Sequence, residues 1–271
     1  MITINNLKKQ FGETCACDIP SFTINDGDIL GLVGNNGAGK TTLFRLLLDL
    51  LKADDGSVEY RFAPTTTATT PDAPASGINP AESEAWKQYV GAYIDQGFLI
   101  DFLTPEEYFA FLGKISGIKQ AEVNERLQQF ERFANGEIFG QKKLIRNLSA
   151  GNTMKVGIIS ALFRQPQIVI LDEPFNFLDP TSQLVLKHLL RDYAQQTGAT
   201  ILISSHNLQH TIDISTRIAL LEHGQIIRDL PNTEGSAGAE LQAYFDQGVE
   251  YGEASGAEEE GTAEEDCTDT K

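Results

Sequence analysis

The stretch that most constrains this chain is a glycine-rich run from Gly34 to Thr42, with the sequence GNNGAGKTT. It follows a short apolar run, Ile29–Val33, and precedes a longer one, Leu43–Leu51. The first run predicts a buried strand and the second a buried helix. Strand, glycine-rich turn and helix, in this order, form the context in which a GxxxxGKT run binds phosphate. The chain is therefore expected to bind a nucleotide.

Each part of this loop has its own role in holding phosphate. Glycines let consecutive backbone N–H groups converge on a phosphate without interference from a Cβ atom. The helix N-terminus adds partial positive charge, and Lys40 would add a full charge at the β- and γ-phosphates. The hydroxyl of Thr41 would ligate Mg²⁺. The expected nucleotide-binding residues of the loop are Gly34, Asn35, Asn36, Gly37, Ala38, Gly39, Lys40, Thr41 and Thr42.

Composition limits the kind of protein that carries the loop. The chain has 271 residues, of which 41% are hydrophobic and 22% charged, as in ordinary globular proteins of one or two domains. Much of its net charge of −17 lies in residues 246–271, which hold ten acidic residues and one lysine. We therefore expect a folded domain over residues 1–245 and a disordered acidic tail over 246–271. Since the sequence has no basic footprint, we expect no nucleic-acid partner.

The cysteines and the apolar runs bear on location. Three cysteines form neither a disulfide framework nor a metal set, and Cys15 and Cys17 would share one face of a strand. The N-terminus lacks the pattern of a signal peptide, and no apolar run approaches the roughly 18–20 residues that span a bilayer. We therefore expect a cytoplasmic protein that acts at a membrane only through a partner.

Strands alternate with helices along the chain, which predicts an α/β core with a mainly parallel sheet. A mainly helical insert is expected at about 98–156, and the low-complexity stretch 63–80 is expected to be a long exposed loop. The predicted strands lie at 3–5, 19–24, 29–33, 57–62, 167–171, 200–205, 218–221 and 225–227, with a turn leading into another strand over 86–94. The predicted helices lie at 43–51, from 104 onward, at about 120–135, at 154–162 and at 184–193. The helix from 104 onward would have an apolar side of Tyr108, Phe109, Phe111 and Leu112. The helix at about 120–135 would place Val123, Leu127, Phe130 and Phe133 in the core.

Two carboxylates follow the apolar strand 167–171. Asp172 can hold Mg²⁺ through its water shell, and the adjacent Glu173 can polarise an attacking water. Beside a phosphate-binding loop, this pair predicts a site of phosphate hydrolysis.

The ordered motifs resemble the ATP-binding subunit of an ABC transporter over residues 1 to about 230. The signature at 148–152 together with His206 distinguishes ABC proteins, because the Walker motifs occur in many NTPases. The motif ranges that match are 34–42 with Walker A, 148–152 with the signature, 168–173 with Walker B and 176–179 with the D-loop. Three single residues also match: Phe11 the aromatic residue that stacks on adenine, Gln96 the Q-loop glutamine near Mg²⁺ and the membrane partner, and His206 the switch histidine.

The signature departs from the family pattern. It reads LSAGN where the family usually has LSGGQ. Ser149 and Gly151, which in the family meet the γ-phosphate from the opposite subunit, are retained. Ala150 adds a methyl group where the family has glycine, and Asn152 is shorter than glutamine. These differences imply altered turnover more than altered nucleotide binding.

The resemblance implies a P-loop NTPase core with an N-terminal antiparallel β part and an inserted helical subdomain. It also implies an ATPase that closes as a pair around ATP and Mg²⁺, with an identical or a different second ATPase subunit. A separately encoded membrane-spanning permease would be its partner, at the inner face of the cell membrane. The short region after the core resembles exporter-type subunits, so we expect export, with import as the open alternative. The implied roles are catalysis for Glu173, His206 and Lys40, nucleotide contact for Phe11, Gln96, Ser149, Gly151 and Asp179, and metal binding for Thr41, Gln96 and Asp172.

Other interpretations compete with these. A soluble ABC-type ATPase acting on ribosomes or DNA is the main alternative, although such proteins usually carry two ATPase halves or long coiled coils. A GTPase or small-molecule kinase would leave the signature unexplained. Among single residues, Phe11 could be a core aromatic, Gln96 a surface glutamine and His206 a histidine paired at a strand end. His188, His210 and His223 are given no role.

Overall fold

The computed structural model describes residues 1–62, 77–233 and 235–245. The predicted exposed loop over 63–76 and the predicted disordered tail over 246–271 lie outside these residues. The strands are β1 (Ile2–Phe11), β2 (Thr14–Ile24), β3 (Ile29–Val33), β4 (Asp55–Tyr60), β5 (Val90–Tyr93), β6 (Ile168–Leu171), β7 (Thr200–Ser205), β8 (Arg217–Glu222) and β9 (Gln225–Pro231). The helices are α1 (Lys40–Leu47), α2 (Pro105–Ile115), α3 (Gln120–Gln128), α4 (Glu131–Ala134), α5 (Ala150–Phe163), α6 (Pro180–Thr197) and α7 (Leu208–Ile214), with short 3-10 turns η1 (Ala85–Gln88), η2 (Gln96–Phe98) and η3 (Ile145–Asn147).

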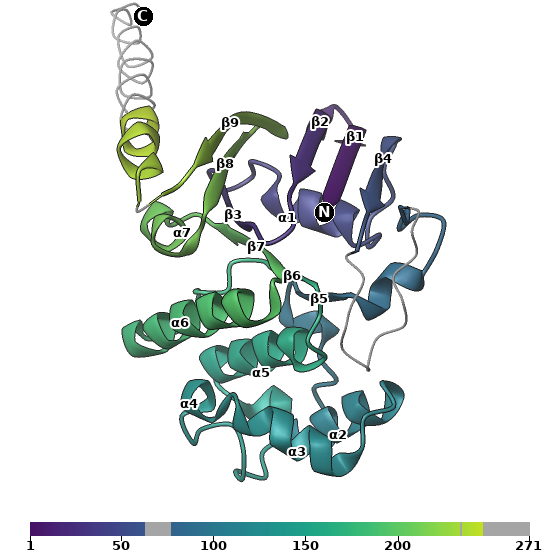
Figure 1. Cartoon of the computed structure of the whole chain (residues 1–271), viewed down its shortest axis with the longest axis vertical. Coiled ribbons are helices and arrows are strands. Elements are labelled where there is room, and N and C mark those ends of the chain that lie inside the picture. The colour runs from purple at the N-terminus through teal and green to yellow at the C-terminus, as the bar shows by residue number, and fades with distance from the viewer. Residues whose placement is uncertain (63–76, 234, 246–271) are drawn as a thin grey trace, which may run out of the picture.

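The strands form two sheets (Figure 1). An antiparallel sheet has the order β2-β1-β4, and a larger sheet has the order β5-β6-β7-β3-β8-β9. In the larger sheet β5, β6, β7, β3 and β8 run parallel, and β9 returns antiparallel to β8. Because β6, β7 and β3 are neighbours and parallel, their carboxyl ends meet at one edge of the sheet.

The larger sheet is covered on both faces, as parallel sheets require. Along β6 the side chains alternate between two apolar clusters. Ile168 and Ile170 pack with α1 and the antiparallel sheet, whereas Val169 and Leu171 pack with α5, α6 and the helices of the insert. Figure 1 shows α1 between the two sheets and α2 to α4 beyond α5. No helix in the described part of the chain is long and apolar enough to cross a membrane.

Several predicted boundaries need correction. The helix after the glycine-rich loop begins at Lys40 and ends at Leu47, since Asp49 turns into a left-handed conformation and Leu50 is exposed. The strand expected at 57–62 runs instead from Asp55 to Tyr60. At the end of the predicted exposed loop, Ile78 is buried and exchanges two backbone hydrogen bonds of 2.8 Å with Tyr60. That part of the loop prediction was wrong.

The helix predicted over 120–135 is divided into α3 and α4. The amide of Phe130 donates to Leu127 O, three residues back, which is a tighter turn than an α-helix makes. Val123, Phe130 and Phe133 are nonetheless buried, as predicted, and Leu127 packs against the same cluster. The apolar spacing therefore identified the core side chains but not the break between the helices.

Two further predictions about exposure were wrong. Phe111 is exposed, although Tyr108 and Phe109 on the same helix are buried. Cys15 is exposed and Cys17 is buried, because β1 and β2 change register between the pairs Lys9–Cys17 and Gln10–Cys15. Such a bulge interrupts the alternation of faces along a strand.

Candidate functional site

The glycine-rich loop connects β3 to α1 and is packed closely against neighbouring backbone. A Cβ atom on Gly34 would lie 2.2 Å from Leu221 O, and one on Gly39 would lie 2.5 Å from Ala16 O. Gly37 has a positive φ of 84° and open space around it. The loop therefore needs glycine at Gly34 and Gly39 for packing and at Gly37 for its backbone turn, and the space beside Gly37 is open.

The start of α1 is prepared for an anion. Its N-cap, Gly39, has no side chain to cap the first amides, and its first turn contains no acidic residue. Lys40 is buried, and its Nζ donates to Gly34 O at 2.6 Å and to Asn35 O at 3.2 Å. Its nearest carboxylate oxygen, Glu173 Oε1, lies 3.8 Å away. Uncapped amides and a buried cation together favour a negatively charged group at this position.

Thr41 and Asp172 lie together across the junction of α1 and β6. Thr41 Oγ1 donates to Asp172 Oδ2 at 2.5 Å, and Ser204 Oγ donates to Asp172 Oδ1. Burial raises the pKa of the Asp172 carboxyl above its ordinary value, whereas the two hydroxyl hydrogen bonds act in the opposite direction. The structure thus places a hydroxyl and a carboxylate, predicted as metal ligands, in direct contact.

Glu173 is held by three contacts around a strained backbone. Its φ is +49°, which is unusual for a residue other than glycine. Its amide donates to Ser204 Oγ at 2.8 Å. Its Oε2 lies 2.8 Å from His206 Nδ1 and accepts from the His206 amide at 3.3 Å. Opposite an ionised carboxylate, Nδ1 carries the proton and donates it. Three of the predicted catalytic groups, Lys40, Glu173 and His206, are therefore in one cluster.

The oxygen ligands suit Mg²⁺. This cation prefers hydroxyl, carboxylate and phosphate oxygens and keeps several waters, so one or two protein ligands are enough beside a nucleotide. Thr41 and Asp172 supply that pair. Gln96, the third predicted metal ligand, is exposed and lies in η2, which follows β5. Since β5 is paired with β6, Gln96 leaves the same edge of the sheet as Asp172.

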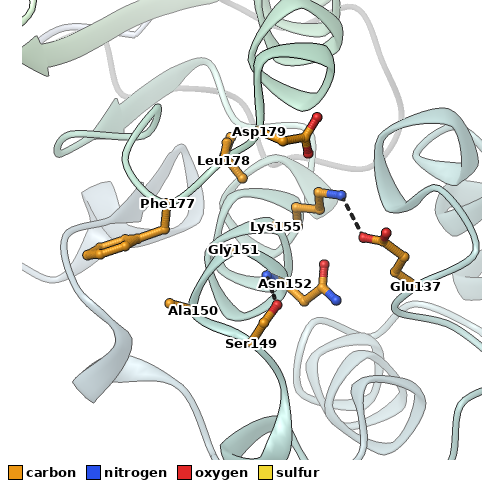
Figure 2. A pocket seen from close by; sticks show the side chains of 9 residues that line it. All are labelled: Glu137, Ser149, Ala150, Gly151, Asn152, Lys155, Phe177, Leu178 and Asp179. Carbon is orange, nitrogen blue, oxygen red and sulfur yellow. Dashed lines mark hydrogen bonds and ion pairs between the residues drawn. The ribbon is translucent and has the colours of Figure 1, made fainter.

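A second group of predicted residues lies elsewhere, around the N-terminus of α5 (Figure 2). Ser149 caps this helix, and its Oγ accepts from Asn152 N at 3.3 Å. Asp179 caps α6 through the amides of Thr181 and Ser182, and the hydrogen bond from the Ser182 hydroxyl, together with these amide bonds, lowers the pKa of its carboxyl. Both residues line one pocket of about 360 Å³, together with Glu137, Ala150, Gly151, Asn152, Lys155, Phe177 and Leu178.

The remaining predicted residues lie on the loop or outside both groups. Thr42 is half-buried in α1, Ala38 is buried, and Asn35 and Asn36 are exposed on the loop. Phe11 is 52% exposed at the end of β1, with Lys9 Nζ 5.5 Å from its ring centre. The alternative that Phe11 is a core aromatic is therefore excluded.

Sequence reasoning missed Ser204 and Lys155. Ser204 is fully buried and contacts the Asp172 carboxylate and the Glu173 amide, although only its place two residues before His206 could have indicated this. Lys155 is buried beneath the pocket of Figure 2, where its Nζ lies 3.1 Å from Glu137 Oε2. A lysine in an otherwise apolar helix was the available signal.

Comparison with known proteins identifies the family of the chain. The family model described as ABC transporter matches residues 17–176, which is more than half of the chain. The chain belongs to the ABC transporter family. The resemblance drawn from the ordered motifs is thereby confirmed.

Curated relatives are named as ATP-binding proteins of transport systems. The methionine import protein MetN of Rhizobium johnstonii is 30% identical over 84% of this chain and 60% of its own length. The tungstate uptake protein TupC of Peptoclostridium acidaminophilum is 30% identical over 83% of this chain and 96% of its own length. The bacitracin transport protein BcrA of Bacillus licheniformis is 29% identical over 85% of this chain and 70% of its own length. The chain thus spans about 60% of the MetN protein and nearly all of TupC.

Solved structures share the fold. The dimeric bacterial ABC transporter cassette MJ0796 aligns with a TM-score of 0.72 over 86% of this chain and 99% of its own, at 21% identity. The same cassette bound to ADP and phosphate, in a post-hydrolysis state, aligns equally well. At this level of identity the likeness concerns the fold, and it confirms the predicted α/β class with a largely parallel sheet and an N-terminal antiparallel sheet.

Proposed function

We propose that this chain is the ATP-binding and ATP-hydrolysing subunit of an ABC transporter, and that two such subunits close around ATP and Mg²⁺. The observation that carries the proposal is the cluster of Lys40, Asp172, Glu173 and His206 at the carboxyl ends of β3, β6 and β7. A cation, a metal-binding carboxylate and a second carboxylate held by histidine are the groups that phosphoryl transfer to water requires.

Binding begins with the loop. Its central amides and the uncapped start of α1 receive the phosphates, and Lys40 exchanges its bonds to Gly34 O and Asn35 O for phosphate oxygens. Phe11, exposed at the end of β1, offers one face for stacking on adenine. Thr41, Asp172 through a water and Gln96 would hold Mg²⁺, which would offset the negative charge of the phosphates.

Glu173 orients the attacking water. Its carboxylate accepts a hydrogen bond from the attacking water and aims the water oxygen at the γ-phosphorus. His206 donates to Oε2 and leaves Oε1 for the water and for the charge of Lys40. The amide bond to Ser204 fixes the backbone from which the side chain projects. Each contact restricts where the carboxylate can point.

The second subunit supplies what the first lacks. Ser149 and Gly151 line a pocket that includes none of the catalytic cluster. We propose that this pocket closes over the γ-phosphate bound by the other subunit, with Asp179 beside it, so that each ATP lies between two chains. Both an identical and a different second subunit satisfy this geometry.

The remaining parts of the proposal concern the membrane. The partner is a separately encoded membrane-spanning permease, and the subunit lies at the inner face of the cell membrane. MetN and TupC are named for import and uptake, and BcrA for transport. We propose export as the direction, and transport by the reconstituted complex in vesicles tests it. Co-purification of RNA or DNA instead of a membrane protein would favour the ribosome- or DNA-acting alternative.

The test uses two variants of the catalytic cluster. Glu173→Gln keeps the shape of the side chain but removes the basic oxygen, so ATP should bind and the pair should close. Loss of a general base slows the chemical step by about 10²–10⁴-fold, and the closed pair should therefore survive size-exclusion chromatography with ATP and Mg²⁺. Lys40→Ala removes the cation that holds the phosphates and should remain monomeric.

The two variants control for each other, because both change one residue of the same cluster. If Glu173→Gln binds ATP but stays monomeric, the pairing of two identical subunits is wrong. If it hydrolyses ATP at the parental rate, the role given to Glu173 is wrong.

A further inference from the structure

His210, in α7, packs its ring on the segment that carries Glu173. The centres of the His210 and Phe175 rings lie 4.8 Å apart, with 31° between the ring planes. Phe175 is buried and comes two residues after Glu173, whereas His210 comes four residues after His206. The ring pair therefore joins the same two segments that the contact between His206 and Glu173 joins.

His206 is attached to the start of α7. Asn207, the next residue, caps this helix, and its Oδ1 accepts from the Gln209 amide at 3.0 Å. Such a cap fixes the chain at its entry to the helix. The distance of the His206 imidazole from Glu173 therefore depends on where α7 lies.

Lys187 of α6 holds α7 and Phe175 from another side. Its Nζ lies 2.6 Å from Asp213 Oδ2 in α7 and 5.7 Å from the centre of the Phe175 ring. A lysine cation within about 6 Å of an aromatic face is attracted to that face. Helix α7 is thus fixed at two places, by the ion pair with Lys187 and by the ring contact of His210 with Phe175.

The surroundings of His210 favour its neutral form. Its Nδ1 is buried and has no hydrogen-bond partner in the described part of the chain, so protonation would leave a buried N–H without an acceptor. Burial lowers the pKa of His210 below its ordinary value, and Lys187 and His206 act in the same direction. The carboxylates of Asp213 and Glu173 act in the opposite direction and are outweighed. These four groups face His210 from α6, α7 and the ends of β6 and β7.

We propose that neutral His210 is a positioning residue for ATP hydrolysis, which acts through its ring contact with Phe175. This contact holds α7, and His206 with it, against the segment of Glu173. The inference rests on the proposed function. When the pH falls, protonation of His210 puts a second cation beside Lys187 and weakens the contact. The rate of the chemical step then falls, and ATP affinity does not, because neither ring belongs to the predicted nucleotide-binding residues.

The first experiment measures kcat and KM for ATP between about pH 5 and pH 8, the range in which histidines titrate. His210→Ala removes the ring and should lower kcat by about 10–100-fold at neutral pH without changing KM, since small displacements of catalytic groups have effects of this order. His210→Phe keeps a ring that cannot be protonated. It should restore kcat and move the acid limb of the kcat profile to lower pH. His188→Ala is the matched control, because His188 is exposed on α6 and should leave kcat and the profile unchanged.

A second experiment tests whether the two rings act as one contact. Phe175→Leu keeps an apolar side chain and removes the ring, so it should lower kcat as His210→Ala does. The double variant should then be no slower than either single variant, because residues in contact are not additive in a double-mutant cycle. Thermal unfolding of each variant establishes that the measured protein is folded at the assay temperature.

The outcomes separate the two proposals. If the parental protein hydrolyses no ATP, or if Glu173→Gln hydrolyses it equally fast, the proposed function fails and this inference fails with it. If hydrolysis requires Glu173 and His210→Ala keeps the parental kcat and acid limb, only the inference is overturned. A loss of kcat that His210→Phe does not restore, or losses that multiply in the double variant, overturn it as well.

Discussion

Removing the hydroxyl of Ser204 should disturb both catalytic carboxylates at once. Ser204 is fully buried at the end of β7, where it donates to Asp172 Oδ1 and accepts from the Glu173 amide at 2.8 Å. A hydrogen bond to a charged group contributes about 1.5–3 kcal/mol and a neutral one about 0.5–1.5 kcal/mol. Ser204→Ala should therefore lower the free energy of unfolding by about 2–4 kcal/mol. The variant should still fold, since domains have about 5–15 kcal/mol of stability.

The effect on catalysis follows from position and charge. Without the hydroxyl, Asp172 and Glu173 lose the group that orients them both, and small displacements of catalytic groups reduce rates by on the order of 10²-fold. The bond from Ser204 lowers the pKa of the Asp172 carboxyl, and burial raises it. Its loss raises this pKa further, so Asp172 becomes protonated at a higher pH. The acid limb of the ATPase pH profile should therefore move to higher pH.

Ser205→Ala is the matched control. Ser205 is also buried in β7, but its Oγ accepts only from the Asn207 amide among the described contacts, at 3.0 Å. Thermal unfolding and the pH dependence of the ATPase rate should be measured for both variants. Ser205→Ala should lose about 1 kcal/mol and keep the pH profile. Equal stability losses and identical profiles in the two variants would refute the role assigned to Ser204.

Three further predictions concern residues around the two groups. Phe11→Ala should weaken ATP binding by about 1–3 kcal/mol, if base–aromatic stacking in nucleic-acid binders is a guide; unchanged affinity in a nucleotide titration would mean that adenine is held elsewhere. Ala150→Gly should raise the ATPase rate with little change in ATP affinity of the single subunit, because the methyl group of Ala150 is exposed on the pocket wall; a steady-state rate that is unchanged or lower would make the alanine neutral. Removal of residues 246–271, with their ten acids and one lysine, should leave the ATPase rate unchanged; a large loss of rate in the purified truncation would show that the segment belongs to the domain.

Local patterns predicted much of the fold. Strand β7 was predicted at its observed bounds, and the helix predicted from 104 onward is α2, which begins at Pro105 with Thr104 as its N-cap, whose Oγ1 accepts from the Glu107 amide at 3.3 Å. These features depend on residues that are close in sequence, so propensity and capping chemistry are enough to identify them. The start of α6 carried the same kind of signal, Asp179 followed by proline, and the predicted helix nevertheless began four residues late.

The clustering of Lys40, Glu173 and His206 was predictable, because each of them comes after a strand of one predicted parallel sheet. Once β3, β6 and β7 are accepted as parallel strands, the residues after their carboxyl ends must be close together. The order of the strands was not predictable from the sequence, since pairing of β6 with β7 joins segments about 30 residues apart. That order is what brings Lys40, Glu173 and His206 into contact.

By itself, the sequence determined the nucleotide-binding loop, the two carboxylates and the family, because each is written in consecutive residues whose chemistry is local. The tertiary structure alone decided how Ser204 connects the Asp172 carboxylate to the Glu173 amide and how Gly151 accommodates the carbonyl of Phe177. It also decided the break between α3 and α4 and the bulge that separates the faces of Cys15 and Cys17. These features arise from atoms that are distant along the chain and adjacent in space, and close packing, not local propensity, determines them.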